Sequence, residues 1–182
     1  MALAIGHRDG QEGRVIIDCV REVRPKFNPQ SVVSEFCGTL KAYRISSVVG
    51  DRFGGEWCRE PFRAAGIAYE ITDKSRSELY LEFLPMLNSD QVRWVDNSRI
   101  AVQLSNLERR TARSGKDTVD HGYAGHDDLS NVVAGVAVAA AAQGASWMEL
   151  ITDEVIRAAS RGPRRVPGLV SSRNLPWLFG GY

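Results

Sequence analysis

The sequence is poor in the residues that build disulfide frameworks and histidine-rich metal sites. It has three cysteines and three histidines in 182 residues. The odd number of cysteines argues against a disulfide framework. Cys19, Cys37 and Cys58 also lie too far apart for the paired spacing of a metal knuckle. A reducing, intracellular setting fits this composition best.

The chain also lacks a strong net charge and a long apolar run. Its formal charge is +1, so any attraction to nucleic acid has to come from local clusters of Lys and Arg. The longest apolar stretch, residues 132–142, is too short to cross a bilayer, and the N-terminus has no signal-peptide pattern. We therefore expect a soluble cytoplasmic protein without membrane contact.

What the chain does contain is enough apolar sequence for one good core, at 43% of residues. Residues 2–7 and 14–23 are β-prone runs, and the glycine-containing segment 8–13 between them predicts a hairpin. Asn28-Pro29 is typical of a helix start, and the apolar spacing that follows predicts a helix to about Arg44.

Strands and helices then alternate along the chain. We expect a strand over 45–50, a helix over 56–65 closed by Gly66, and a strand over 67–71. Ser75-Arg76-Ser77-Glu78 has the form of a capping box, and the helix that it opens either kinks or ends at Pro85.

The rest of the core follows the same alternation. Residues 92–95 form a possible short strand, and Ile100, Leu104 and Leu107 recur at helical spacing. Residues 111–123 have no periodicity and predict a loop or a loose hairpin, and a helix with a small alanine face begins near Asp128.

This order predicts an α/β fold of the ribonuclease H-like type. Two strands in hairpin order followed by βα units favour a mixed sheet with helices on both faces. The third antiparallel strand usual in that fold is not obvious, and we expect it within residues 20–27. We assign residues 1–143 to this domain and residues 144–182 to a C-terminal helix and an extended tail.

Two acidic motifs suggest a metal site. An apolar strand delivers Asp51 to its end, and Gly54 and Gly55 then clear space beside it. Far downstream, Asp127 and Asp128 lie at the start of a helix. Hard cations such as Mg²⁺ and Mn²⁺ prefer carboxylate oxygens. Taken alone, however, each motif is more typical of a turn or of a first helical turn.

Several motifs in one order resemble the C-terminal nuclease domain of the large terminase subunit of tailed phages, over roughly residues 2–141. They are Leu3-Ala4-Ile5-Gly6-His7, Val20-Arg21-Glu22-Val23-Arg24-Pro25, Gly50-Asp51-Arg52-Phe53-Gly54-Gly55-Glu56-Trp57, Lys74-Ser75-Arg76-Ser77-Glu78-Leu79-Tyr80, Leu84-Pro85-Met86-Leu87-Asn88-Ser89, Leu107-Glu108-Arg109-Arg110-Thr111, and Asp120-His121 ahead of Gly125-His126-Asp127-Asp128. One such motif would be weak evidence, whereas their shared order is specific.

The resemblance implies an endonuclease that cuts double-stranded DNA during genome packaging with two Mg²⁺ or Mn²⁺ ions. By resemblance, Asp51 is the second acidic ligand, and Asp127 with Asp128 supplies the third. His126 and Arg52 are possible supporting residues. The implied partners are the terminase ATPase domain, the small terminase subunit and the portal, in the cytoplasm of a bacterium that carries the phage or prophage.

The chain departs from the family at its start. The first acidic residue of the family belongs on the first strand, upstream of the segment where this sequence begins. Asp9 and Asp18 do not occupy the equivalent place. We therefore expect a fragment truncated at the N-terminus, without the ATPase domain, that lacks one metal ligand, binds metal weakly and cleaves little DNA.

A basic segment just before the second acidic motif is the candidate DNA contact. Its cations are Arg109, Arg110, Arg113 and Lys116. Interleaved hydroxyl and glycine residues suit contacts to phosphates without base reading. A solvated charged loop is about equally consistent with the pattern. The side chains that could extend the patch are Lys74, Arg76, Arg52 and Arg59.

Other functions remain open from the sequence alone. One alternative is a non-catalytic remnant that binds DNA or the packaging complex, and another is a different ribonuclease H-like enzyme, such as a resolvase or a transposase. The apolar C-terminus either folds back on the domain, which we favour, or docks on a partner through Trp177 and Phe179.

Overall fold

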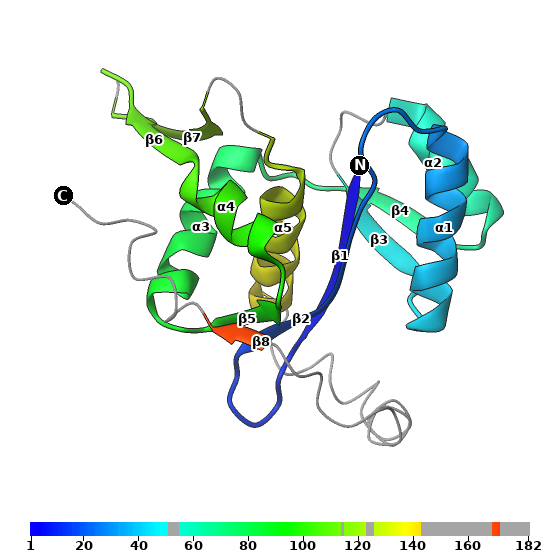
Figure 1. The fold of residues 1–182 in the computed structure, drawn as a ribbon, viewed down its shortest axis with the longest axis horizontal. Helices are drawn as coiled ribbons and strands as arrows, with labels where there is room; N and C mark the ends of the chain where they lie inside the picture. Colours follow the sequence, from blue (N-terminus) through cyan, green and yellow to red (C-terminus); the bar gives the residue numbers. More distant parts are fainter. Residues whose placement is uncertain (51–54, 114, 123–125, 143–168, 172–182) are drawn as a thin grey trace. The chain divides into compact units, whose positions relative to one another are not determined.

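The computed structural model describes residues 1–50, 55–113, 115–122, 126–142 and 169–171 (Figure 1). The chain divides into two compact units. The first contains Met1 and Glu22–Ser75, and the second contains Ala2–Arg21 and Arg76–Tyr182. In the described part of the chain, no helix combines the length and the apolar character that spanning a membrane requires.

A four-stranded mixed sheet forms the base of the second unit. Its strands are β1 (Ala2–Arg8), β2 (Val15–Glu22), β5 (Val92–Val95) and β8 (Leu169–Ser171), in the order β1-β2-β5-β8. Strands β2 and β5 are parallel, and β5 and β8 are antiparallel. The predicted hairpin between β1 and β2 is confirmed, and Gly13 takes the positive φ of 67° that its turn requires.

Three helices of the second unit surround its core. They are α3 (Arg76–Asn88), α4 (Ser98–Ser105) and α5 (Asp128–Ala142), and α5 packs against β1, α3 and α4 (Figure 1). The centre of this core contains Ile17, Phe83, Trp94 and Val133, each at most 1% exposed. Pro85 lies inside α3, which continues beyond it to Asn88.

The first unit contains the βα alternation that the sequence predicts. Its elements are α1 (Pro29–Ala42), β3 (Ser47–Gly50), α2 (Gly55–Ala64) and β4 (Ala68–Ile71), with β3 and β4 parallel. Asn28 caps α1 because its side chain accepts hydrogen bonds from the amides of Gln30 and Ser31. Gly66 follows α2 with a φ of 77°, as expected for a C-terminal glycine.

The α/β class is confirmed, and two local expectations are wrong. Residues 23–28 contain no strand, so the third antiparallel strand expected within 20–27 is absent there. Leu107 belongs to β6 (Leu107–Thr111) and not to the preceding helix, which ends at Ser105. Leu104 and Leu107 line the same apolar pocket, so both are apolar. Their three-residue spacing fits a helix, although α4 ends between them.

The segment predicted as a loop or loose hairpin is a hairpin. Strand β6 pairs with the antiparallel strand β7 (Asp117–His121), from Leu107 opposite His121 to Thr111 opposite Asp117 (Figure 1). The helix predicted at the start of residues 144–182 lies outside the described residues. Within the predicted tail, β8 adds a strand to the main sheet.

Close packing of α5 on β1 generates a first prediction. A Cβ on Gly6 would lie 2.6 Å from the carbonyl oxygen of Ile16 and 2.9 Å from Cγ1 of Val136. We expect Gly6→Ala to lower the free energy of unfolding by about 1–3 kcal/mol, measured by urea denaturation, because the backbone of β2 has to move.

Gly135→Ala on α5 is the matched control. There the added Cβ meets only Cδ1 of Leu79, at 4.0 Å, which is ordinary contact. Replacing a helical glycine should then stabilise the protein by about 0.5–1 kcal/mol. Equal effects of the two substitutions would contradict this account of the helix–sheet contact.

Candidate functional site

The first candidate ligand, Asp51, lies outside the described residues, as does Arg52. The strand that leads to it is described. Gly50 ends β3 opposite Ile71, and a Cβ at position 50 would overlap the phenol of Tyr69 on β4. A larger residue at position 50 would therefore have to displace the Tyr69 ring. The predicted convergence of Asp51 with Asp127 and Asp128 stays a prediction.

The second candidate ligand, Asp127, is a buried ion-paired carboxylate. The residue is 7% exposed and directly precedes α5. Nη1 of Arg76 lies 3.2 Å from its Oδ1 and 3.1 Å from its Oδ2. Tyr80 donates a hydrogen bond of 3.0 Å to the same Oδ2. Both carboxylate oxygens therefore already have protein donors.

Arg76 joins this carboxylate to the hairpin. Its Nη2 lies 2.9 Å from Oδ1 of Asp120 on β7. The next residue, Ser77, donates to the carbonyl of Val119 at 3.1 Å and accepts from the amide of Val119 at 3.0 Å. The first turn of α3 thus holds both β7 and the start of α5.

The phenol of Tyr80 acts as a neutral donor in this cluster. Burial raises the pKa of Tyr80 far above its usual value, and the nearby Asp127 carboxylate raises it further. The phenol oxygen also lies 2.9 Å from Oγ of Ser130, which donates to the carbonyl of Asp127 at 3.0 Å. Every member of this network is therefore hydrogen-bonded.

Gln103 is a structural residue that the sequence analysis missed. Its side-chain oxygen accepts hydrogen bonds from the amides of Leu129 and Ser130, at 2.9 Å and 3.0 Å. These amides belong to the first turn of α5, where helical partners are lacking. The available signal was an amide side chain within the buried stripe that Ile100, Gln103 and Leu104 form on α4.

The remaining acidic and histidine side chains near the start of α5 face solvent more openly. Asp128 is the first residue of α5 and is exposed, as is His126. Nε2 of His121 lies 3.9 Å from both Oδ1 of Asp127 and Oδ1 of Asp120, which is beyond hydrogen-bond range. The structure therefore places a buried Asp127 directly before an exposed Asp128.

A divalent cation here would need several oxygen ligands. Among the residues that the structure describes, no three His, Cys, Asp or Glu side chains form a group that could hold a metal ion. Asp128 is an exposed carboxylate, and the oxygens of Asp127 accept hydrogen bonds from Arg76 and Tyr80. The described residues fit a cation only in part, so a cation held here would need ligands from other residues.

Two of the four predicted DNA-binding cations are ion-paired within the hairpin. Arg109 pairs with Asp117, and Nη2 of Arg110 lies 2.6 Å from Oε2 of Glu108. Arg113 and Lys116 lie in the turn between β6 and β7, are exposed, and make no ion pair with the described part of the chain. The uncompensated positive charge of the hairpin is therefore at its tip.

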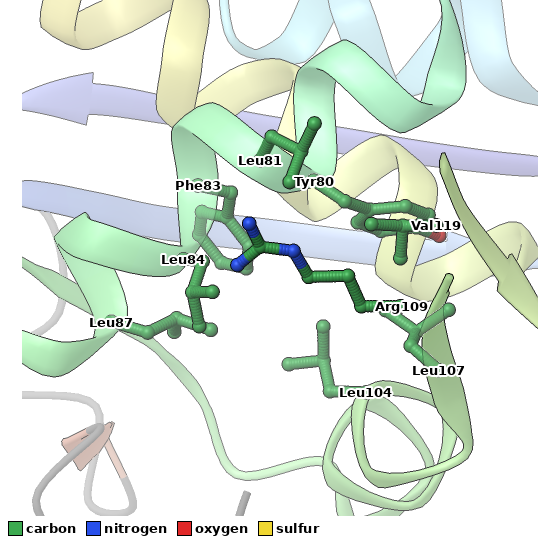
Figure 2. A pocket seen from close by; sticks show the side chains of 9 residues that line it. All are labelled: Tyr80, Leu81, Phe83, Leu84, Leu87, Leu104, Leu107, Arg109 and Val119. Atoms are coloured by element: carbon green, nitrogen blue, oxygen red, sulfur yellow. The ribbon is translucent and has the colours of Figure 1, made fainter. Parts of the chain in front are cut away.

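Arg109 also covers an apolar pocket between α3, α4 and the hairpin. Figure 2 shows its side chain extending from β6 across the pocket toward Phe83 and Leu84. The lining residues are Tyr80, Leu81, Phe83, Leu84, Leu87, Leu104, Leu107, Arg109 and Val119. The aliphatic stem of an arginine can pack on such a surface while its charge remains hydrated. This packing gives Arg109 a structural role.

Comparison with known proteins shows which fold this is. No family model matches the sequence, and no curated protein matches it. The large terminase nuclease from thermophilic phage G20c is similar in structure, with a TM-score of 0.59 and 20% identity over 76% of this chain and 81% of that chain.

Two metal-bound structures of the phage G20c nuclease are also similar. The structure with bound cobalt has a TM-score of 0.56 at 21% identity, covering 78% of this chain and 81% of that one. The structure with bound magnesium has a TM-score of 0.58 at 20% identity, covering 78% and 82%. The chain therefore has the ribonuclease H-like fold of phage large terminase nucleases.

The buried network generates a second prediction. We expect Tyr80→Phe to lower the free energy of unfolding by about 1–2 kcal/mol, because Oδ2 of Asp127 loses a donor without regaining water. Urea denaturation measures this loss. In an Asp127→Asn background the same substitution should cost less, since the charged acceptor is gone. Additive effects of the two substitutions would contradict the coupling.

Proposed function

We propose that this chain is a DNA endonuclease domain of the terminase type that depends on divalent cations. One observation carries the proposal. A fold shared with phage terminase nucleases presents an exposed carboxylate, Asp128, at the start of α5, next to a carboxylate that is already ion-paired. The substrate is double-stranded DNA, and the reaction is hydrolysis of a phosphodiester bond.

The cation would be Mg²⁺ or Mn²⁺ in a two-ion site. The phage G20c structures with bound cobalt and bound magnesium support a divalent metal. When bound, such ions activate a water molecule and stabilise the leaving oxygen. In this chain Asp128 would contribute an outward carboxylate from the start of α5, and Asp51 would contribute another from the end of β3. Arg52 and His126 would support the phosphate or the water.

Asp127 has a different part in this proposal. Its contacts with Arg76 and Tyr80 make it the residue that fixes the start of α5, from which Asp128 projects. With Asp127 engaged, we expect weak metal binding and slow cleavage. The same observation favours a second candidate function, a non-catalytic domain that binds DNA or the packaging complex.

The wider assignment follows the same fold likeness. We propose that the chain acts with a terminase ATPase domain, a small terminase subunit and a portal, in the cytoplasm of a bacterium that carries the phage or prophage. Residues 1–143 would form the nuclease domain, and residues 144–182 would follow as a helix and a tail.

The endonuclease assignment predicts the effect of removing one carboxylate. We expect Asp128→Asn to slow Mn²⁺-dependent nicking of supercoiled plasmid on the order of 100-fold, the scale of losing one charged contact to the transition state. Asp51→Asn should have a similar effect. Asp96→Asn, at another exposed aspartate, is the matched control and should leave the rate unchanged.

Two outcomes would count against this assignment. Nicking by the unaltered protein that persists in Asp128→Asn would remove Asp128 from the site. DNA binding without nicking at any Mn²⁺ concentration would instead favour the second candidate function.

The hairpin predicts a salt effect on DNA binding. Replacing Arg113 and Lys116 by Ala should reduce the slope of log affinity against log salt by about 1.8, because each lost phosphate contact contributes about 0.9. Replacing Arg109 and Arg110 should change the slope less, since Asp117 and Glu108 compensate their charges. Fluorescence anisotropy over a salt series measures both slopes, and an unchanged slope for the first pair would discard the hairpin tip as a DNA contact.

A further inference from the structure

The carboxylate of Asp127 is already paired with a positively charged side chain of the protein, the guanidinium of Arg76. A single nitrogen of Arg76, Nη1, lies 3.1–3.2 Å from both carboxylate oxygens. The side chain of Asp127 is only 9% exposed, so little of the carboxylate is open to another partner. A guanidinium and a divalent cation would therefore use the same two oxygens.

We propose that Arg76 competes with divalent metal for Asp127 and so weakens metal binding at the start of α5. This inference rests on the proposed function, because it concerns the same cation site. In the arginine-bound form Asp128 is the carboxylate of the pair that faces solvent. Departure of Arg76 would add Asp127 as a second ligand.

The contacts of Arg76 would allow its side chain to leave Asp127 when a metal ion binds. Its side chain is 40% exposed, and its second partner, Asp120, is 59% exposed. Ion pairs between exposed groups contribute little to stability, so the Asp120 contact adds little to holding Arg76 in place. Arg76 is also the first residue of α3, so its side chain can leave without disturbing a helical interior.

The change in metal affinity on removal of Arg76 distinguishes two roles of this residue, competition with the metal ion and positioning of Asp127. If Arg76 competes, its removal deletes a positive charge and frees a carboxylate, and both changes favour cation binding. If Arg76 only orients Asp127, its removal lets the carboxylate move and weakens cation binding. The two roles predict opposite changes in metal affinity.

The experiment is a titration of the whole chain with Mn²⁺, with free Mn²⁺ followed by electron paramagnetic resonance. We expect Arg76→Gln to bind Mn²⁺ about five- to tenfold more tightly than the unaltered protein, as expected for losing one nearby charge. Adding Asp127→Asn to Arg76→Gln should abolish this gain. Asp127→Asn alone should weaken Mn²⁺ binding, because it removes a negative charge and leaves the charge of Arg76 less compensated.

Arg14→Gln is the matched control, since it removes the same charged group from another arginine–aspartate pair of the second unit, Arg14 with the buried Asp90. It should leave Mn²⁺ affinity within about twofold. Circular dichroism and thermal unfolding check the folding of each variant.

A second measurement on the unaltered protein keeps the inference testable if Arg76→Gln does not fold. Saturating Mg²⁺ should move the side-chain ¹⁵Nε resonance of Arg76, assigned with Arg76→Lys, toward the position of a solvated arginine. A resonance that does not move would overturn the competition.

The outcomes also distinguish the inference from the proposed function. Suppose that Arg76→Gln binds Mn²⁺ more tightly only when Asp127 is present, and that no variant cleaves DNA. This result would support the competition and contradict the endonuclease assignment. Cleavage by the unaltered protein, with unchanged or weaker Mn²⁺ binding by Arg76→Gln, would overturn the competition and leave the endonuclease assignment intact.

Discussion

The burial of one carboxylate constrains the candidate site more than any other feature. An ionised aspartate that loses most of its water is strongly destabilising unless charged and hydrogen-bonding partners replace that water. Asp127 receives three such contacts, two from Arg76 and one from Tyr80. Because both partners come from the first turns of α3, this requirement fixes where α3 meets the start of α5.

The same requirement connects the hairpin to the core. Glu108 and Asp120 lie directly opposite each other on β6 and β7, an arrangement of like charges that is unfavourable. Arg110 neutralises Glu108 from within the hairpin, and Arg76 neutralises Asp120 from α3. Arg76 therefore pairs with two acidic groups at once, and the buried hydrogen bonds between Ser77 and Val119 attach the hairpin to α3.

Local sequence signals predicted the elements well, because caps, glycines and apolar spacing act over a few residues. The start of α1 at Asn28, the glycine after α2 and the strand at 92–95 follow from such signals. Leu107 was misplaced since its spacing from Leu104 fits a helix as well as a helix end followed by a strand. Arg76 contacts a residue that is 51 positions away in the sequence, and Gln103 contacts residues that are 26 and 27 positions away. No local sequence pattern specifies such pairs.

Charged residues that look alike in the sequence differ in the structure by their ion-pair partners. Arg109 and Arg110 resemble a phosphate-binding pair in the sequence, but their carboxylate partners lie on the hairpin itself. Arg76 is one of the cations that could extend a DNA-binding patch in the sequence, but in the structure it is the counter-ion of a buried aspartate. Near the start of α5, Asp120 and Asp127 share the positive charge of Arg76, and the exposed Asp128 adds a further carboxylate. Carboxylates repel a DNA phosphate, so a nuclease function at this place would need additional positive charge, from bound cations or from further basic side chains.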